Sequence, residues 1–150
     1  MIEKGNLYLD SSVKKESLEY GWSRLFIRCG WMKWIFLIGD DKFTINSLKM
    51  LPYDGCISIY EVSGINERLC VDYGDDHVFY DVIDDTSDFD EYIRTIPFRN
   101  PVIIMMTYTS SYKVVDILKQ KDFPRDIYVD NDLGVVVPIQ TFVDMGMPMS

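Results

Sequence analysis

The stretch Cys56–Ile83, CISIYEVSGINERLCVDYGDDHVFYDVI, decides the fold class of this chain. It contains three segments rich in β-branched and aromatic residues, at 56–62, 69–73 and 77–83. The links between these segments contain glycines and are too short for a crossover connection. We therefore expect three consecutive strands that form an antiparallel meander.

Further strands are expected on both sides of this stretch. Upstream, the run 31–38 is apolar except for Lys33. Downstream, the run 101–108 carries no charge, which is typical of a central strand buried on both faces. Two short strands, 127–129 and 135–139, are expected near the C-terminus. The prediction is an α+β domain with a mostly antiparallel sheet of about five to seven strands.

Two or three helices are expected between these strands. The residue patterns favour helices at 12–20, 88–96 and 110–121, while 44–51 is compatible with either a short helix or a strand. The helix at 110–121 lies between two predicted strands, so 101–129 forms one βαβ unit in this prediction. We expect residues 144–150 to be a frayed tail.

Size and composition indicate one intracellular domain. A chain of 150 residues, 47% of them hydrophobic, fits a single domain over 1–150. Its first ten residues lack the apolar core and cleavage site of a secretory signal, and no apolar run is long enough to span a bilayer. Three cysteines without a CxxC pair are expected to be reduced thiols. We therefore expect a cytoplasmic protein.

The negative charge of the chain is confined to one window. The formal net charge is −9, and residues 69–93 contain nine acidic residues but no Lys or Arg. Residues 1–68 contain nine acidic and nine basic residues, and residues 94–150 contain six of each. The acidic residues of the window are Asp72, Asp75, Asp76, Asp81, Asp84, Asp85, Asp88, Asp90 and Glu91.

Local rules explain part of this window. Asp75 and Asp76 follow Gly74 in a turn, and Asp88 with Glu91 resembles a capping box at a helix start. The lack of any balancing cation is not explained in this way, because most surfaces mix both signs. A strand of seven residues separates the two groups by about 23 Å, so we expect the acids to form a ridge.

The sequence favours binding over catalysis. His77 is the only histidine and has no nucleophile signature nearby. The chain lacks a Walker A loop, a zinc-deaminase motif and an EF-hand pattern, so no cofactor or metal is expected. Asp81 is the window's only candidate for a glycosidase-type acid, and its alternation with apolar residues equally fits a solvent-facing position.

A basic protein is the expected partner of the acidic window. Nucleic acid and anionic membranes are negative and are therefore unfavourable partners for it. Carboxylates match Lys and Arg, and tyrosines supply contact area at interfaces. Strand addition at an exposed sheet edge is a second mode of binding, which leaves almost no charge signature. The expected partner-binding residues are the nine acids of the window together with Tyr73 and Tyr80.

In size, acidity and lack of catalytic motifs, the chain resembles bacterial immunity proteins of contact-dependent inhibition systems. The resemblance implies a cytoplasmic, non-catalytic protein that binds a basic toxin domain, such as a nuclease, in a one-to-one complex. The acidic ridge would then take the place of nucleic-acid phosphates. Two alternatives are a DNA-mimic inhibitor and a small metal-dependent hydrolase that uses scattered carboxylates.

Overall fold

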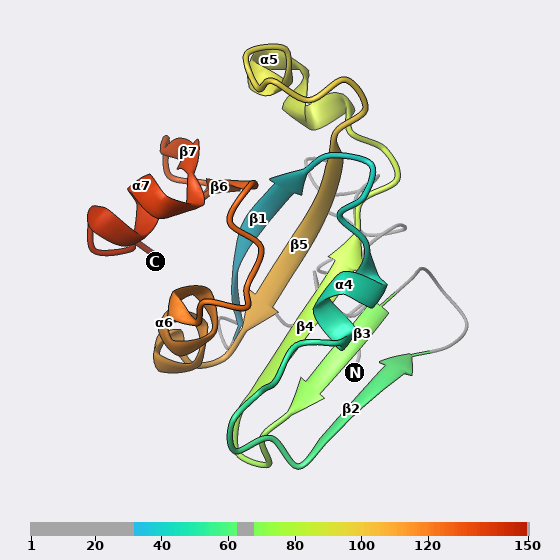
Figure 1. Cartoon of the computed structure of the whole chain (residues 1–150), viewed down its shortest axis with the longest axis vertical. Helices are drawn as coiled ribbons and strands as arrows, with labels where there is room; N and C mark the ends of the chain where they lie inside the picture. The colour runs from blue at the N-terminus through green and yellow to red at the C-terminus, as the bar shows by residue number, and fades with distance from the viewer. Residues whose placement is uncertain (1–31, 63–67, 150) are drawn as a thin grey trace, which may run out of the picture.

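The computed structural model describes residues 32–62 and 68–149. Within them, seven strands form one antiparallel sheet in the order β2-β3-β4-β5-β1-β6-β7 (Figure 1). The strands are β1 (Lys33–Gly39), β2 (Ser58–Val62), β3 (Arg68–Asp72), β4 (His77–Val82), β5 (Val102–Tyr108), β6 (Tyr128–Asp130) and β7 (Val136–Pro138). The predicted α+β class is confirmed. The helix expected at 12–20 lies outside the described residues.

The helical elements of the described residues are short. They are α4 (Ile45–Lys49), the 3-10 turn η1 (Ser87–Phe89), α5 (Asp90–Ile93), α6 (Ser111–Lys119) and α7 (Ile139–Asp144). The ambiguous segment 44–51 is helical because a reciprocal capping box begins it: Thr44 and Ser47 each accept the other's backbone N–H.

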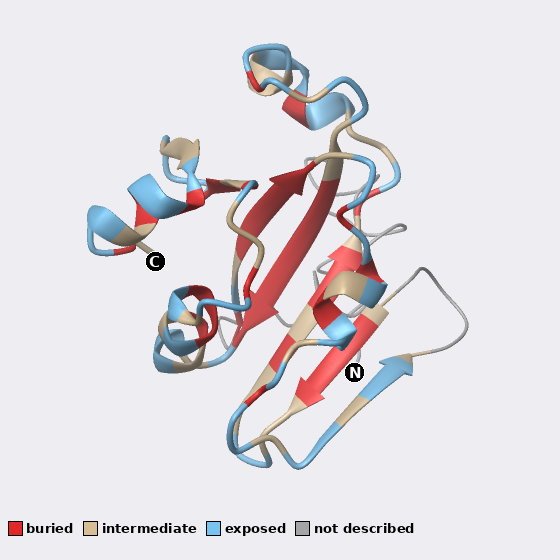
Figure 2. Ribbon diagram, viewed as in Figure 1, coloured by how far each residue is buried: buried red, intermediate tan, exposed pale blue. Residues whose placement is uncertain are grey.

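The expected meander is confirmed, since β2, β3 and β4 are successive antiparallel neighbours. The centre of the sheet is the pair β5 and β1, and residues 103–108 are all buried (Figure 2). Both β5 and β6 run antiparallel to β1, so they are parallel to each other and α6 connects them. The expected βαβ unit is therefore present, with β1 inserted between its two strands.

The two faces of the sheet carry separate hydrophobic clusters. On one face, α4, α6 and α7 pack on residues such as Leu37, Tyr80 and Met106. On the other face, the η1–α5 segment places Phe89 edge-on against Phe36 of β1, with ring centroids 4.9 Å apart. Alternation of side chains along β1 and β5 supplies both clusters, which is why both strands are apolar apart from Lys33 and Thr107.

Two expectations about chain segments are wrong. The helix predicted at 88–96 is shorter, and Phe89 occupies the N-cap of α5 without any side-chain capping bond, so Asp88 and Glu91 form no capping box. The tail is packed rather than frayed: α7 ends at Asp144, and Met147 beyond it is only 6% exposed. The Met147 N–H donates to the Phe142 carbonyl at 3.0 Å, which holds the tail against the helix.

Candidate partner-binding surface

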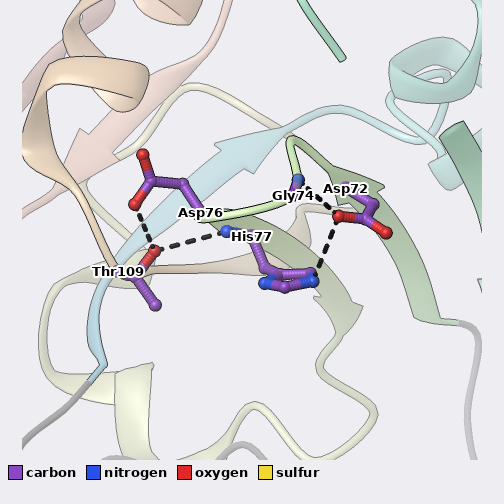
Figure 3. A network of polar contacts seen from close by, with 5 residues as sticks. All are labelled: Asp72, Gly74, Asp76, His77 and Thr109. Atoms are coloured by element: carbon purple, nitrogen blue, oxygen red, sulfur yellow. Dashed lines mark hydrogen bonds and ion pairs between the residues drawn. The ribbon is translucent and has the colours of Figure 1, made fainter. Parts of the chain in front are cut away.

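The turn between β3 and β4 organises the first group of acidic residues. Gly74 adopts a φ of +89°, a conformation that favours glycine. The Gly74 N–H donates to Oδ1 of Asp72 at 2.7 Å, and the same oxygen lies 3.2 Å from Nε2 of His77 (Figure 3). One carboxylate therefore holds the turn and contacts the imidazole, while Asp75 at the tip is exposed.

The next carboxylate, Asp76, connects this turn to the end of β5. The Thr109 hydroxyl donates to Oδ1 of Asp76 at 3.2 Å and accepts the His77 N–H at 3.3 Å (Figure 3). Thr109 lies between β5 and α6, so the turn and the start of α6 are neighbours. Ser110 occupies the N-cap of α6 but makes no side-chain capping bond.

A pocket of about 330 Å³ lies beside the turn, and its walls include Asp54, Tyr73, Lys113 and Asp116. Nζ of Lys113 is 4.4 Å from the centroid of the Tyr73 ring, within the range of a cation–π contact. Burial, followed by the charges of Cys56, Asp116 and Asp54, raises the pKa of Tyr73 to about 12. The phenol is therefore neutral at physiological pH and keeps its proton as a hydrogen-bond donor.

Exposed apolar side chains lie at the same end of the domain. Ile57 is 70% exposed, and Tyr112 in the first turn of α6 is 82% exposed. A Cβ built on Gly74 would lie 2.9 Å from Cδ1 of Ile57, so Ile57 contacts the turn directly. We call this surface the turn patch and define it as Asp54, Ile57, Asp72, Tyr73, Asp75, Asp76, Tyr112 and Asp116.

Carboxylates outnumber cations in the turn patch. It contains five aspartates, and the cations at its border are Lys113 and Lys119, which line the pocket. Aromatic and aliphatic contact area surrounded by charge is the usual composition of a protein–protein interface. A surface of this charge attracts Lys and Arg side chains.

The other acids of the window lie at the opposite end of β4, about 20 Å away at 3.3 Å per residue (Figure 1). Most of them are exposed, and Asp85 accepts the Ser87 N–H at 3.0 Å to begin η1. Two exposed cations, Arg94 and Arg99, follow α5 closely. We call this second surface the helix-end patch and define it as Asp84, Asp85, Asp88, Asp90 and Glu91.

Two of the expected binding residues are buried between these patches. Tyr80 is fully buried on the helix-covered face, where its hydroxyl lies 3.3 Å from that of Tyr53. Asp81 is 3% exposed and accepts hydrogen bonds from Nε and NH2 of Arg68 at 2.5 and 3.2 Å. The expectation of a continuous ridge is therefore corrected: the acids form two separate patches, and Tyr80 and Asp81 belong to neither.

The pairing of β3 with β4 explains part of the missing counter-charge. Arg68 lies one residue before the acidic window, but the register places it directly opposite Asp81. Its guanidinium also lies 5.4 Å from the centroid of the Phe79 ring. Along the sequence, Asp81 has no Lys or Arg near it within residues 69–93. In the sheet, however, Arg68 on the neighbouring strand lies directly opposite Asp81 and balances its charge.

Four residues of the turn patch were not predicted from the sequence: Asp54, Ile57, Tyr112 and Asp116. They come from the loop before β2 and from α6, and both segments have an ordinary charge balance. No local sequence pattern identifies these four residues, because they reach the turn only when the chain folds into the sheet.

The described residues offer no evident metal centre. Within residues 32–62 and 68–149, no group of three or more His, Cys, Asp or Glu side chains could hold a metal ion. Asp81, the candidate glycosidase-type acid, is paired with an arginine rather than with a second carboxylate.

Comparison of the chain with protein-family models, curated proteins and solved structures found no match. Among the described helices, none combines the length and the apolar character that crossing a membrane requires.

Proposed function

We propose that this chain is a non-catalytic binding protein of the immunity type, which holds a basic toxin domain in the cytoplasm through the turn patch. The observation that carries the proposal is the convergence of five aspartates with exposed Ile57 and Tyr112 at one end of the sheet. These residues come from four segments of the chain, namely the loop before β2, the end of β3, the following turn and α6.

In this proposal, charge speeds the association of the two proteins, and apolar contact stabilises the complex once it has formed. The carboxylates attract Lys and Arg of the partner over long range and speed association, which is the main effect of complementary charge. Ile57 and Tyr112 supply apolar contact once the complex forms. Tyr73, which is half-buried beside Lys113, is a neutral donor at the centre of the patch. The helix-end patch has the same sign of charge but lacks an exposed aromatic residue and lies beside two arginines.

The test compares two double variants with the same change in charge. Asp54→Lys with Asp75→Lys alters the turn patch, and Asp88→Lys with Asp90→Lys alters the helix-end patch. The partner is first isolated by co-purification with the unmodified chain from the native host. Each variant is then produced together with that partner, and cell survival and association rates are measured. We expect the turn-patch variant to lose protection and to associate about tenfold more slowly at low salt, while the other keeps protection.

The matched pair separates position from net charge, because both variants change the formal charge equally. Equal loss in both variants would mean that only total charge matters, which contradicts the turn patch as the binding surface. Full protection by the turn-patch variant, with association rates independent of ionic strength, would overturn the proposed function. The thermal stability of each variant is the control for folding.

A further inference from the structure

The two edges of the sheet differ in how well they are protected. β7 is only three residues long and ends at Pro138, and both features discourage the addition of another strand. β2 is the outermost described strand on the other side, and its five residues, SIYEV, include no Pro, Lys or Arg. Within the described residues, this edge therefore lacks the short length and the proline that protect β7.

The hydrogen-bonding phase of β2 follows from the neighbouring turn. The Tyr73 N–H donates to the Asp76 carbonyl at 2.9 Å, so Tyr73 faces β4, and by alternation Asp72 faces β2. The Ile57 N–H also donates to the Asp72 carbonyl at 2.6 Å, so this carbonyl faces the β2 side, and Ile57 lies before the regular alternation of β2 begins at Ser58. In the β2–β3 register Asp72 pairs with Ser58.

It follows that every second residue of β2, beginning with Ser58, bonds to β3. The residues between them, Ile59 and Glu61, direct their backbone N–H and C=O groups away from the sheet. Two donors and two acceptors are thus available to an added strand on the outer side of β2.

Apolar side chains border this edge. Of the six large hydrophobic residues that are most exposed within the described chain, three lie here: Met50 is 74% exposed, Ile57 70% and Tyr60 45%. Nζ of Lys49 lies 2.7 Å from Oε2 of Glu61, which brings the end of α4, and with it Met50, beside β2. An added strand would therefore gain side-chain contacts as well as main-chain hydrogen bonds.

The charge beside the β2 edge determines which kind of segment can be added to it. Asp54 and Asp75 are exposed at the Ile57 end of β2, and Ile57 contacts the turn at Gly74. The edge is therefore continuous with the turn patch. A second copy of this chain, with a formal charge of −9, is a poor occupant of such a site, whereas a segment that bears Lys or Arg is a good one.

We propose that β2 accepts an extended, Lys- or Arg-bearing segment of the partner protein as an eighth strand of the sheet. This inference rests on the proposed function and names its mode of binding. The added strand bonds to the backbone of Ile59 and Glu61, its apolar side chains contact Tyr60, and its cations lie near Asp54 and Asp75.

The first experiment uses a probe of known chemistry. A capped peptide of about ten residues, alternating Lys and Val, is long enough to cover β2. Amide hydrogen exchange is measured by NMR with and without the peptide. We expect slower exchange at Ile59 and Glu61, and no change with an otherwise equal peptide that alternates Glu and Val or that is N-methylated on every second residue. Unchanged exchange at both amides with the Lys–Val peptide would overturn the proposal.

The second experiment uses a matched pair of variants at one position. Glu61→Pro removes an outward N–H, while Glu61→Ala removes the same carboxylate and its contact with Lys49 but keeps the N–H. We expect the Pro variant to bind the Lys–Val peptide about tenfold more weakly than the Ala variant. The exchange measurement on the unmodified chain decides the matter if the Pro variant does not fold.

The outcomes separate this inference from the proposed function. If the Asp54→Lys with Asp75→Lys variant loses binding and both Glu61 variants bind equally, the turn patch is retained and strand addition is excluded. If Ile59 and Glu61 become protected as the concentration of the protein alone rises, and light scattering detects a dimer, the occupant is a second copy and the inference is overturned.

Discussion

Two cross-strand contacts between a basic residue and an aspartate lie at the two ends of the β3–β4 ladder, on the same face of the sheet. In one, the side chains of Arg68 and Asp81 are 11% and 5% exposed; in the other, those of His77 and Asp72 are 35% and 26% exposed. The ring of Phe79 lies between them, stacked on His77 and under Arg68. Residues of the same chemical type therefore have different roles: the buried pair is part of the interior, and the exposed pair belongs to the turn patch.

The largest expected effect is at the buried end. Asp81→Ala removes both hydrogen bonds that Asp81 accepts from the Arg68 guanidinium, and we expect it to lower the free energy of unfolding by about 3–5 kcal/mol in urea denaturation. Replacing both partners, as Arg68→Met with Asp81→Leu, should recover most of this loss. A cost for Asp81→Ala no greater than that of Asp72→Ala would show that burial does not separate the two pairs.

The next effect is at the turn itself. Gly74→Ala places a side chain on a backbone with φ of +89° and should cost about 1–2 kcal/mol, measured by thermal denaturation. Gly55→Ala is the control, because Gly55 has φ of +81° and no atom within 4 Å of the added carbon. The difference between the variants isolates the contact with Ile57, whose flexible end we expect to move aside. A much larger cost at Gly74 would mean that Ile57 is held rigidly.

A smaller effect is expected at the exposed pair. Asp72→Asn removes the charge facing His77 but keeps an oxygen that accepts the Gly74 N–H. Because both side chains are partly solvated, we expect a loss of at most about 1 kcal/mol in denaturant unfolding. A loss as large as that of Asp81→Ala would remove the distinction between the two ends.

The smallest effect appears only in alkali. The pKa of Tyr73 is about 12 in the folded protein against 10.0 in the unfolded chain, because burial disfavours the phenolate. The neutral phenol therefore contributes its full stabilisation below pH 10, and this is lost as the pH rises from 10 to about 12. Tyr73→Phe should flatten the fall of the unfolding free energy over this range, followed by circular dichroism. If the unfolding free energy of Tyr73→Phe falls with pH as steeply as that of the unmodified chain, the Tyr73 phenol is exposed to solvent rather than buried.

Strand positions were predicted well from the sequence because each strand has its own local signal. In the meander, short segments rich in β-branched and aromatic residues are separated by turn residues. The runs at 31–38 and 101–108 are instead almost continuously apolar. Helices α5 and α7 were predicted poorly. The first is a single turn preceded by η1, and the second is held by packing of Ile139 and Phe142 on the sheet rather than by its own pattern.

The candidate surface was predicted in part. The acids of the β3–β4 turn follow from composition and turn chemistry, and Asp72, Tyr73, Asp75 and Asp76 are where the sequence analysis placed them. Tyr80 and Asp81 were wrongly predicted to lie on the surface. The alternation of residues along β4 shows that their side chains point to opposite faces of the sheet, but it does not show that both side chains are buried.

The sequence by itself determined the α+β class, the meander and the excess of acid between residues 69 and 93, since these depend on neighbours along the chain. Only the tertiary structure decided which acids are exposed. It placed Arg68 opposite Asp81, separated the remaining acids by the length of β4, and brought Asp54, Ile57 and Tyr112 to the turn. The physical reason is that charge pairing and burial act through space, across hydrogen-bonded strands whose register no local pattern specifies.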